Sequence, residues 1–116
     1  MAAALFRDYY PSLSQEDLAT SDILLFDNQG ALAYRDCHII GLVVAPSYRQ
    51  QGLGSYLVRS LMNDCSTLTA NVLFTESYNL AFWQALGFVI TEINSVQSYF
   101  QLRYDAPARP LSPLVA

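Results

Sequence analysis

Leu42-Val-Val-Ala-Pro-Ser-Tyr-Arg-Gln-Gln-Gly-Leu-Gly-Ser55 joins an aliphatic segment to a segment of helical periodicity through a short polar turn. The aliphatic segment, Cys37 to Ala45, is dominated by Ile, Leu and Val and predicts a central strand buried on both faces. Pro46 ends this strand because proline has no backbone N–H to extend the ladder. From Gly52 to Asp64, leucines recur every four positions, which indicates an amphipathic helix.

The turn between these two elements has the features of a phosphate site. Free backbone N–H groups at a helix start, together with the positive end of the helix dipole, attract anions. Gly52 and Gly54 leave the backbone open to a pyrophosphate, and Arg49 adds a charged donor. Glycines also occur in such turns for chain geometry alone, and this alternative stays open. Leu57 replaces the third glycine of the dinucleotide fingerprint, which argues against a nicotinamide or flavin cofactor.

The flanking segments predict a mixed α/β sheet. A short helix with Ser14 as its N-cap precedes a hairpin formed by Ile23–Asp27 and Ala31–Arg35. The elements predicted downstream are a strand at Asn71–Thr75, a helix at Tyr78–Leu86 that stops at Gly87, and strands at Phe88–Ile93 and Gln97–Tyr104.

The composition is that of one folded domain. The chain has 116 residues, of which 53% are hydrophobic and 14% are charged, so it can bury a core. We expect the domain over residues 1–104 and a proline-rich tail over 105–116. No apolar run approaches the roughly 20 residues of a membrane-spanning helix, so no membrane partner is expected. The net charge is −4 and the six arginines are scattered, which argues against nucleic-acid binding.

The cysteines and the N-terminus bear on metal binding and location. Cys37 and Cys65 lie 28 positions apart, without Cys-x-x-Cys spacing, and the chain has one histidine. These residues do not make a typical zinc site, so no metal is expected. The first residues lack the basic region and apolar stretch of a signal peptide. We therefore expect a cytoplasmic protein whose two reduced cysteines are buried packing residues or inert thiols.

Two motifs resemble those of the GNAT superfamily of N-acetyltransferases. Val44-x-Pro46-x-x-Arg49-x-x-Gly52-x-Gly54 is similar to its acetyl-CoA signature, and Phe82-Trp-Gln-Ala-Leu-Gly-Phe88 is similar to its second hallmark, a helix that ends in Leu-Gly-Phe. The resemblance implies a GNAT-like acyl-CoA N-acyltransferase fold, which is an α+β fold with a mixed, mostly antiparallel central sheet and flanking helices. It implies a short form with a reduced N-terminal region.

The resemblance also implies a site for acetyl-CoA as co-substrate. Backbone amides from Gln50 to Ser55 would hold the pyrophosphate, and the central strand would separate from its neighbour to pair with the pantetheine arm. A bulge eased by Gly41 is expected in that strand. The residues that the resemblance assigns to the coenzyme are Leu42, Val43, Val44, Arg49, Gln50, Gln51, Gly52, Leu53, Gly54, Ser55, Asn79, Phe82 and Trp83.

Direct acetyl transfer needs a base for the amine and an acid for the thiolate. Trp83 stands where many family members carry an acid tyrosine, and an indole N–H donates a hydrogen bond without releasing a proton. The base of the histone-acetylating branch corresponds to His38, whose ordinary pKa suits the role. Glu76 is the second candidate base. A structural histidine and a solvated helix-terminal carboxylate are the alternatives for these two residues.

Three functions remain as alternatives. The first is direct transfer of the acetyl group of acetyl-CoA to a primary amine of a small-molecule or peptide acceptor. The second is a catalytically weak acetyl-CoA- or CoA-binding module that regulates a protein partner, which the tryptophan at position 83 favours. The third is an interaction domain with a fortuitous glycine turn. Tyr9, Tyr10 and Tyr34 are either acceptor-site or packing residues, and a homodimer through the last strands is left open.

Overall fold

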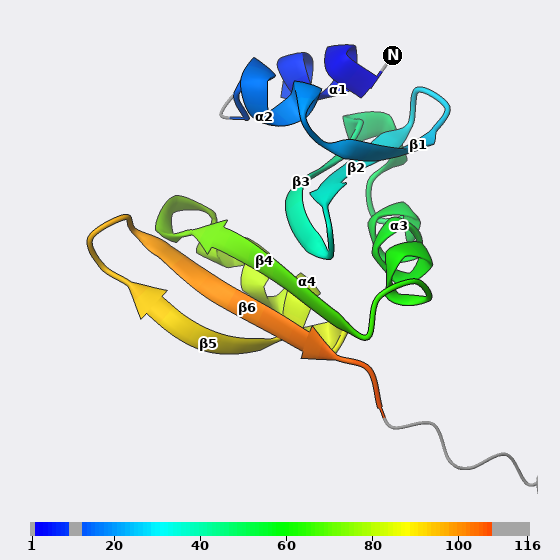
Figure 1. The fold of residues 1–116 in the computed structure, drawn as a ribbon. Helices are drawn as coiled ribbons and strands as arrows, with labels where there is room; N and C mark the ends of the chain where they lie inside the picture. Colours follow the sequence, from blue (N-terminus) through cyan, green and yellow to red (C-terminus); the bar gives the residue numbers. More distant parts are fainter. Residues whose placement is uncertain (1, 10–12, 108–116) are drawn as a thin grey trace, which may run out of the picture.

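The chain folds around one six-stranded sheet, seen in a computed structural model that describes residues 2–9 and 13–107 (Figure 1). The strands lie in the order β1-β2-β3-β4-β6-β5. The elements are α1 (Ala2–Tyr9), α2 (Gln15–Ala19), β1 (Asp22–Phe26), β2 (Gly30–Arg35), β3 (His38–Val44), the 3₁₀ helix η1 (Pro46–Tyr48), α3 (Leu53–Met62), β4 (Thr67–Leu73), the 3₁₀ helix η2 (Phe74–Asn79), α4 (Leu80–Ala85), β5 (Val89–Asn94) and β6 (Tyr99–Asp105).

The sheet is mixed and mostly antiparallel, which confirms the predicted fold class. β1, β2 and β3 pair antiparallel, and so do β4, β6 and β5. β3 and β4 join these two halves in parallel, through only the pairs His38–Thr69 and Ile39–Ala70. Beyond that junction the two halves diverge, as Figure 1 shows. The predicted hairpin and the strand, helix, strand, helix, two-strand order downstream are confirmed.

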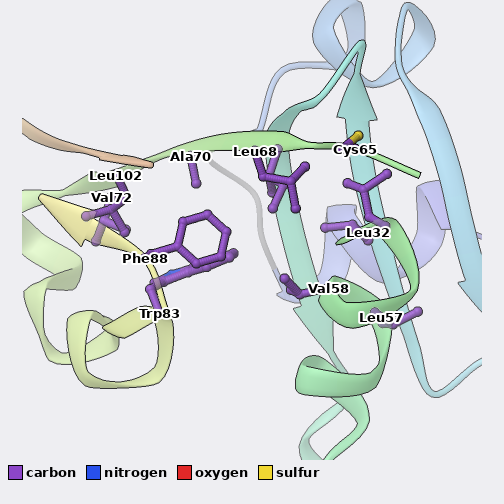
Figure 2. Close-up of a cluster of buried hydrophobic side chains, with 12 residues drawn as sticks. Leu32, Leu57, Val58, Cys65, Leu68, Ala70, Val72, Trp83, Phe88 and Leu102 are labelled. Carbon is purple, nitrogen blue, oxygen red and sulfur yellow. The ribbon is translucent and has the colours of Figure 1, made fainter. Parts of the chain in front are cut away.

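Two hydrophobic clusters stabilise the fold. The larger cluster lies between the sheet, α3 and α4. Figure 2 shows Phe88 and Trp83 below β4, and Leu57 and Val58 on α3. The smaller cluster lies under α1 and α2, on the other face of β2 and β3. The members of the smaller cluster are Leu5, Phe6, Ala31, Ala33, Val43 and Ala45, with Leu13, Leu18, Ile23 and Ile40 packed against them.

The expected bulge is present in β3. Ala33 pairs with Gly41 and Tyr34 pairs with Ile39, which leaves Ile40 as an extra residue. Gly41 fits against α1, because a Cβ atom there would lie 3.1 Å from the ring of Phe6. The strand packs on both faces, as predicted, because Ile39 belongs to the larger cluster and Val43 to the smaller one, and half-buried residues alternate with the buried ones along it. Its half-buried residues Ile40, Leu42 and Val44 line a cavity on the side where the strand was expected to separate from its neighbour.

Several boundaries differ from the prediction. Ser14 caps α2 as predicted, by accepting a hydrogen bond of 3.0 Å from the Asp17 N–H, but α1 adds a second helix before the first strand. β4 begins at Thr67 and ends at Leu73 because residues 74–79 form η2, and the helix predicted from Tyr78 therefore starts at Leu80. Most of the predicted tail, residues 108–116, lies outside the described residues.

The two cysteines form a disulfide, so the prediction of free thiols is wrong. Cys37 lies in the turn before β3, and Cys65 lies in the loop between α3 and β4. Their Cα atoms are 6.0 Å apart, within the range that a disulfide spans. A separation of 28 residues conceals this proximity, because it arises only when α3 folds back beside the sheet. No helix in the described part of the chain is long and apolar enough to cross a membrane.

Replacement of Phe88 by alanine should lower the free energy of unfolding by about 3–5 kcal/mol. Phe88 is only 2% exposed, and its ring centroid lies 5.1 Å from that of Trp83 and 5.6 Å from that of Tyr104. Urea denaturation of the wild-type and variant proteins measures the loss. Val96→Ala is the control, since Val96 is 93% exposed and its truncation should change stability by no more than about 0.5 kcal/mol. Equal effects of the two variants would contradict the assignment of Phe88 to the core.

Candidate functional site

A cavity of about 620 Å³ opens where β3 and β4 separate. One wall consists of β3, the turn after it and the first turn of α3, and the opposite wall consists of β4, η2 and α4. Tyr9 of α1 completes the lining. The lining residues are Tyr9, Ile39, Ile40, Gly41, Leu42, Val43, Val44, Tyr48, Arg49, Gln50, Gly52, Leu53, Gly54, Ser55, Ala70, Asn71, Val72, Glu76, Tyr78, Asn79, Phe82 and Trp83.

The separation of the strands leaves backbone groups facing the cavity. β3 and β4 have their last shared pair at Ile39 and Ala70, whereas the outer edges of both strands stay paired with β2 and β6. The inner edge of β3 from Ile40 to Val44 therefore has no neighbouring strand in the described structure. Such an edge can form hydrogen bonds with an extended ligand, as it would with an added strand.

The turn at the open end of β3 presents free amides. The Arg49 Nε donates a hydrogen bond of 2.9 Å to the Val44 carbonyl oxygen, which ties the turn to the strand. Gln50 and Gly52 have φ values of 62° and 82°, in the left-handed region. The N–H groups at the start of α3 have no acceptor within the helix. A Cβ atom at Gly52 would meet nothing within 4 Å, so the backbone is open to a ligand here. The turn is thus built to receive an anionic group.

Two aromatic side chains of α4 form the opposite wall. The ring of Phe82 lies 3.4 Å from the position of a Cβ atom at Gly54, so α3 and α4 approach closely at this glycine. Trp83 is 7% exposed, and it packs edge-on against Phe82 and Phe88 with both ring centroids 5.1 Å away. The indole is therefore a core side chain as well as part of the cavity lining.

The structure separates the two candidate bases. Glu76 is half-buried and lines the cavity from η2, where its φ of −115° interrupts the helical backbone. His38 lies at the closed end, outside the lining, and its Nδ1 shares a hydrogen bond of 2.6 Å with the Thr69 Oγ1. Burial, and secondarily the positive charge of Arg35, lower the pKa of His38 from its ordinary value of 6.5. Only Glu76 of this pair faces the space where a substrate would bind.

The predicted coenzyme residues converge on the cavity, with one exception. All of them line it except Gln51, which is exposed in the turn. The cavity lining also includes Tyr48, Asn71 and Tyr78, which no spacing pattern in the sequence marks, because loops and the separation of the strands bring them there. Tyr9 lines the cavity, Tyr34 packs against the larger cluster, and Tyr10 lies outside the described residues. The described residues contain no cluster of His, Cys, Asp or Glu side chains suited to a metal ion.

Comparisons with known proteins agree with this geometry. The model of the acetyltransferase (GNAT) family matches residues 7–88. A Bacillus subtilis acetyltransferase in complex with CoA has a similar structure, with a TM-score of 0.72 and 16% identity over 91% of each chain. A GNAT family acetyltransferase from Elizabethkingia anophelis with acetyl-CoA bound has a TM-score of 0.71 and 18% identity over 90% of each chain. No curated protein matches the sequence significantly.

The lowered pKa of His38 predicts a specific loss of stability in mild acid. Between the ordinary pKa and the lower folded value, the unfolded chain binds a proton that the folded chain does not. Stability is therefore lost as the pH falls from about 6.5 toward the folded pKa. Urea unfolding at pH 7.5 and pH 5.5 should show a smaller loss for His38→Gln than for the wild type. Equal losses would mean that His38 does not titrate as its surroundings require.

Proposed function

The chain belongs to the GNAT family of acetyltransferases, and we propose that its cavity binds acetyl-CoA and that the chain transfers the acetyl group directly to a primary amine. The observation that carries the proposal is the cavity itself. A strand edge without a neighbour leads to an open glycine turn at the start of α3, so one continuous surface offers both an extended backbone and free amides. Acetyl-CoA would supply the activated thioester.

The turn fits the pyrophosphate of this co-substrate. The amides from Gln50 to Ser55 and the positive end of α3 favour a doubly charged group. The open space at Gly52 lets that group approach the backbone, and Arg49 adds a positive charge at the same place. This fit favours a phosphate role for the glycines over a purely conformational one.

The strand edge fits the pantetheine arm. This arm is extended and carries amide groups, so the free N–H and C=O groups of residues 40–44 can pair with it in the manner of an added strand. Asn79 and Phe82 line the opposite wall and would enclose the arm from the side of α4. The arm would thus run between β3 and α4, with its reactive end deep in the cavity.

Glu76 is the residue that we assign as the general base. Its carboxylate lines the cavity and is suited to accept a proton from an ammonium or attacking amine, directly or through water. The Trp83 indole can donate a hydrogen bond toward a departing thiolate, but it cannot give that thiolate a proton. A cationic amine also suits this site. Glu76 is the one acidic side chain among the lining residues and would attract the amine, whereas the positive charge of Arg49 faces the phosphate turn.

The buried indole also favours a second candidate function. A site that lacks a hydroxyl at position 83 binds the coenzyme without efficient turnover if no other group assists the thiolate. The chain would then act as a coenzyme-dependent regulator of a protein partner. An assay of free thiol release across a panel of small-molecule and peptide amines separates the two functions. Tight acetyl-CoA binding without thiol release for any acceptor would support the regulator.

Addition of a negative charge to the turn should weaken acetyl-CoA binding. Gln50→Glu preserves the size of a cavity-lining side chain, and its carboxylate should repel the pyrophosphate. We expect roughly a tenfold higher dissociation constant, which corresponds to about 1.4 kcal/mol. Trp83 is the single tryptophan and lines the cavity, so its fluorescence can follow the titration.

Gln84→Glu is the matched control for this experiment. It makes the same change on the exposed surface of α4, outside the cavity lining. Its affinity for acetyl-CoA should equal that of the wild type. If both charge additions weaken binding equally, or if the wild type does not bind, the assignment of the coenzyme to this turn fails.

Removal of the Glu76 carboxylate should lower kcat by roughly 10²- to 10⁴-fold, the usual contribution of a general base. Glu76→Gln should leave the dissociation constant of acetyl-CoA nearly unchanged, because the amide keeps the shape of the side chain. Glu92→Gln, on β5 and outside the cavity lining, is the control and should retain full activity. If Glu76→Gln stays active while His38→Gln loses activity and its pH dependence, the base is His38.

A further inference from the structure

The disulfide encloses one whole wall of the cavity. Cys37 precedes β3 and Cys65 follows α3, 28 positions later, so the segment between them contains β3, the glycine turn and α3. Every cavity residue from Ile39 to Ser55 lies within this closed loop. The opposite wall, from Ala70 to Trp83, lies outside it. The crosslink therefore anchors both ends of the wall that carries the phosphate turn.

The same crosslink lies at the junction from which the two walls diverge. The Thr69 N–H donates a hydrogen bond of 3.0 Å to the Cys37 carbonyl oxygen, and His38 next to it bonds to the side chain of Thr69. β3 and β4 share only two residue pairs here. The backbone connection between the walls is thus a very short ladder, and the disulfide supplements it and the packing of the larger cluster with one covalent bond.

The two cysteines differ in how deeply they are buried. Cys65 is 7% exposed and belongs to the larger hydrophobic cluster, as Figure 2 shows. Cys37 is half-buried at the edge of that cluster, so it is the cysteine that a small dithiol would attack first. Burial of one sulfur protects the bond, and partial exposure of the other leaves a route to reduction.

We infer that the Cys37–Cys65 disulfide positions the coenzyme wall, so that its reduction weakens acetyl-CoA binding. The inference rests on the proposed function. In the reduction, a dithiol gives up two electrons and two protons, the S–S bond breaks to two thiols, and the dithiol becomes a disulfide. The wall then keeps its two ladder pairs with β4, the hydrogen bond of His38 to Thr69 and the packing of the larger cluster, but it loses its covalent tie. Binding must restore the arrangement of the wall, and that cost appears as lower affinity.

The test compares oxidised and dithiothreitol-reduced wild-type protein, with the thiol content verified by mass spectrometry. Reduction should raise the dissociation constant and the KM for acetyl-CoA by roughly fivefold or more, the range of a modest coupling between sites. It should change kcat at saturating acetyl-CoA by less than about twofold, because Glu76 lies outside the closed loop. Amide hydrogen exchange should accelerate in residues 38–44.

A double variant and a stability control separate positioning from general destabilisation. Cys37→Ala combined with Cys65→Ala should bind acetyl-CoA as weakly as the reduced protein does, and its dissociation constant should not change when dithiothreitol is added. Leu5→Ala removes a buried side chain of the smaller cluster that does not line the cavity, and it should lower stability without raising the dissociation constant at a temperature where the protein stays folded.

Two results would overturn the inference. One is unchanged exchange in residues 38–44 after complete reduction, and the other is faster exchange there with an unchanged dissociation constant. Failure of the oxidised wild type to bind acetyl-CoA would instead overturn the proposed function. The exchange measurement still reports in that case whether the disulfide holds the wall, so the two failures are distinguishable.

Discussion

β3 and β4 share only two residue pairs, and most of the molecule is arranged around that short junction. A longer ladder would close the sheet and fill the space that now forms the cavity. A strand edge without a neighbour is costly unless water or a ligand satisfies its backbone groups. The placement of the helices follows from the same junction. α3 and α4 pack beside the opening, and their side chains form part of its walls.

The aromatic packing of α4 shows how stability and chemistry share the same side chains. Trp83 fills the core between Phe82 and Phe88, and the same indole faces the cavity. Replacement of this indole by a catalytic side chain would therefore disturb the packing of the core. The hydroxyl groups that line the cavity come instead from Ser55 on α3 and from tyrosines on α1, η1 and η2, all of which lie outside the core.

The sequence predicts what is local and misses what is brought together by folding. The hairpin, the strand that ends at Pro46 and the helix after Gly52 follow from short-range patterns, and the structure has them. Nearly all of the residues that the family motifs predict for the coenzyme also line one cavity. The disulfide and the position of Glu76 depend on contacts across the sheet, and the 3₁₀ conformation of η2 has no periodicity that marks it.

The extra residue in β3 has a consequence for how sequences of this kind can change. Ile39 packs with the larger cluster, whereas Ile40 and Val43 pack with the smaller one and Leu42 returns to the larger. Side chains alternate along a strand, so this assignment depends on the count of residues after the bulge. Deletion of Ile40 would remove the bulge and keep Ile39 opposite Tyr34 and Gly41 opposite Ala33, so the later side chains would stay on their faces. Deletion of a residue after the bulge would instead turn the rest of the strand over. Loss of a single residue should therefore be tolerated during evolution at the bulge itself, but it should be excluded from the part of the strand that follows Gly41.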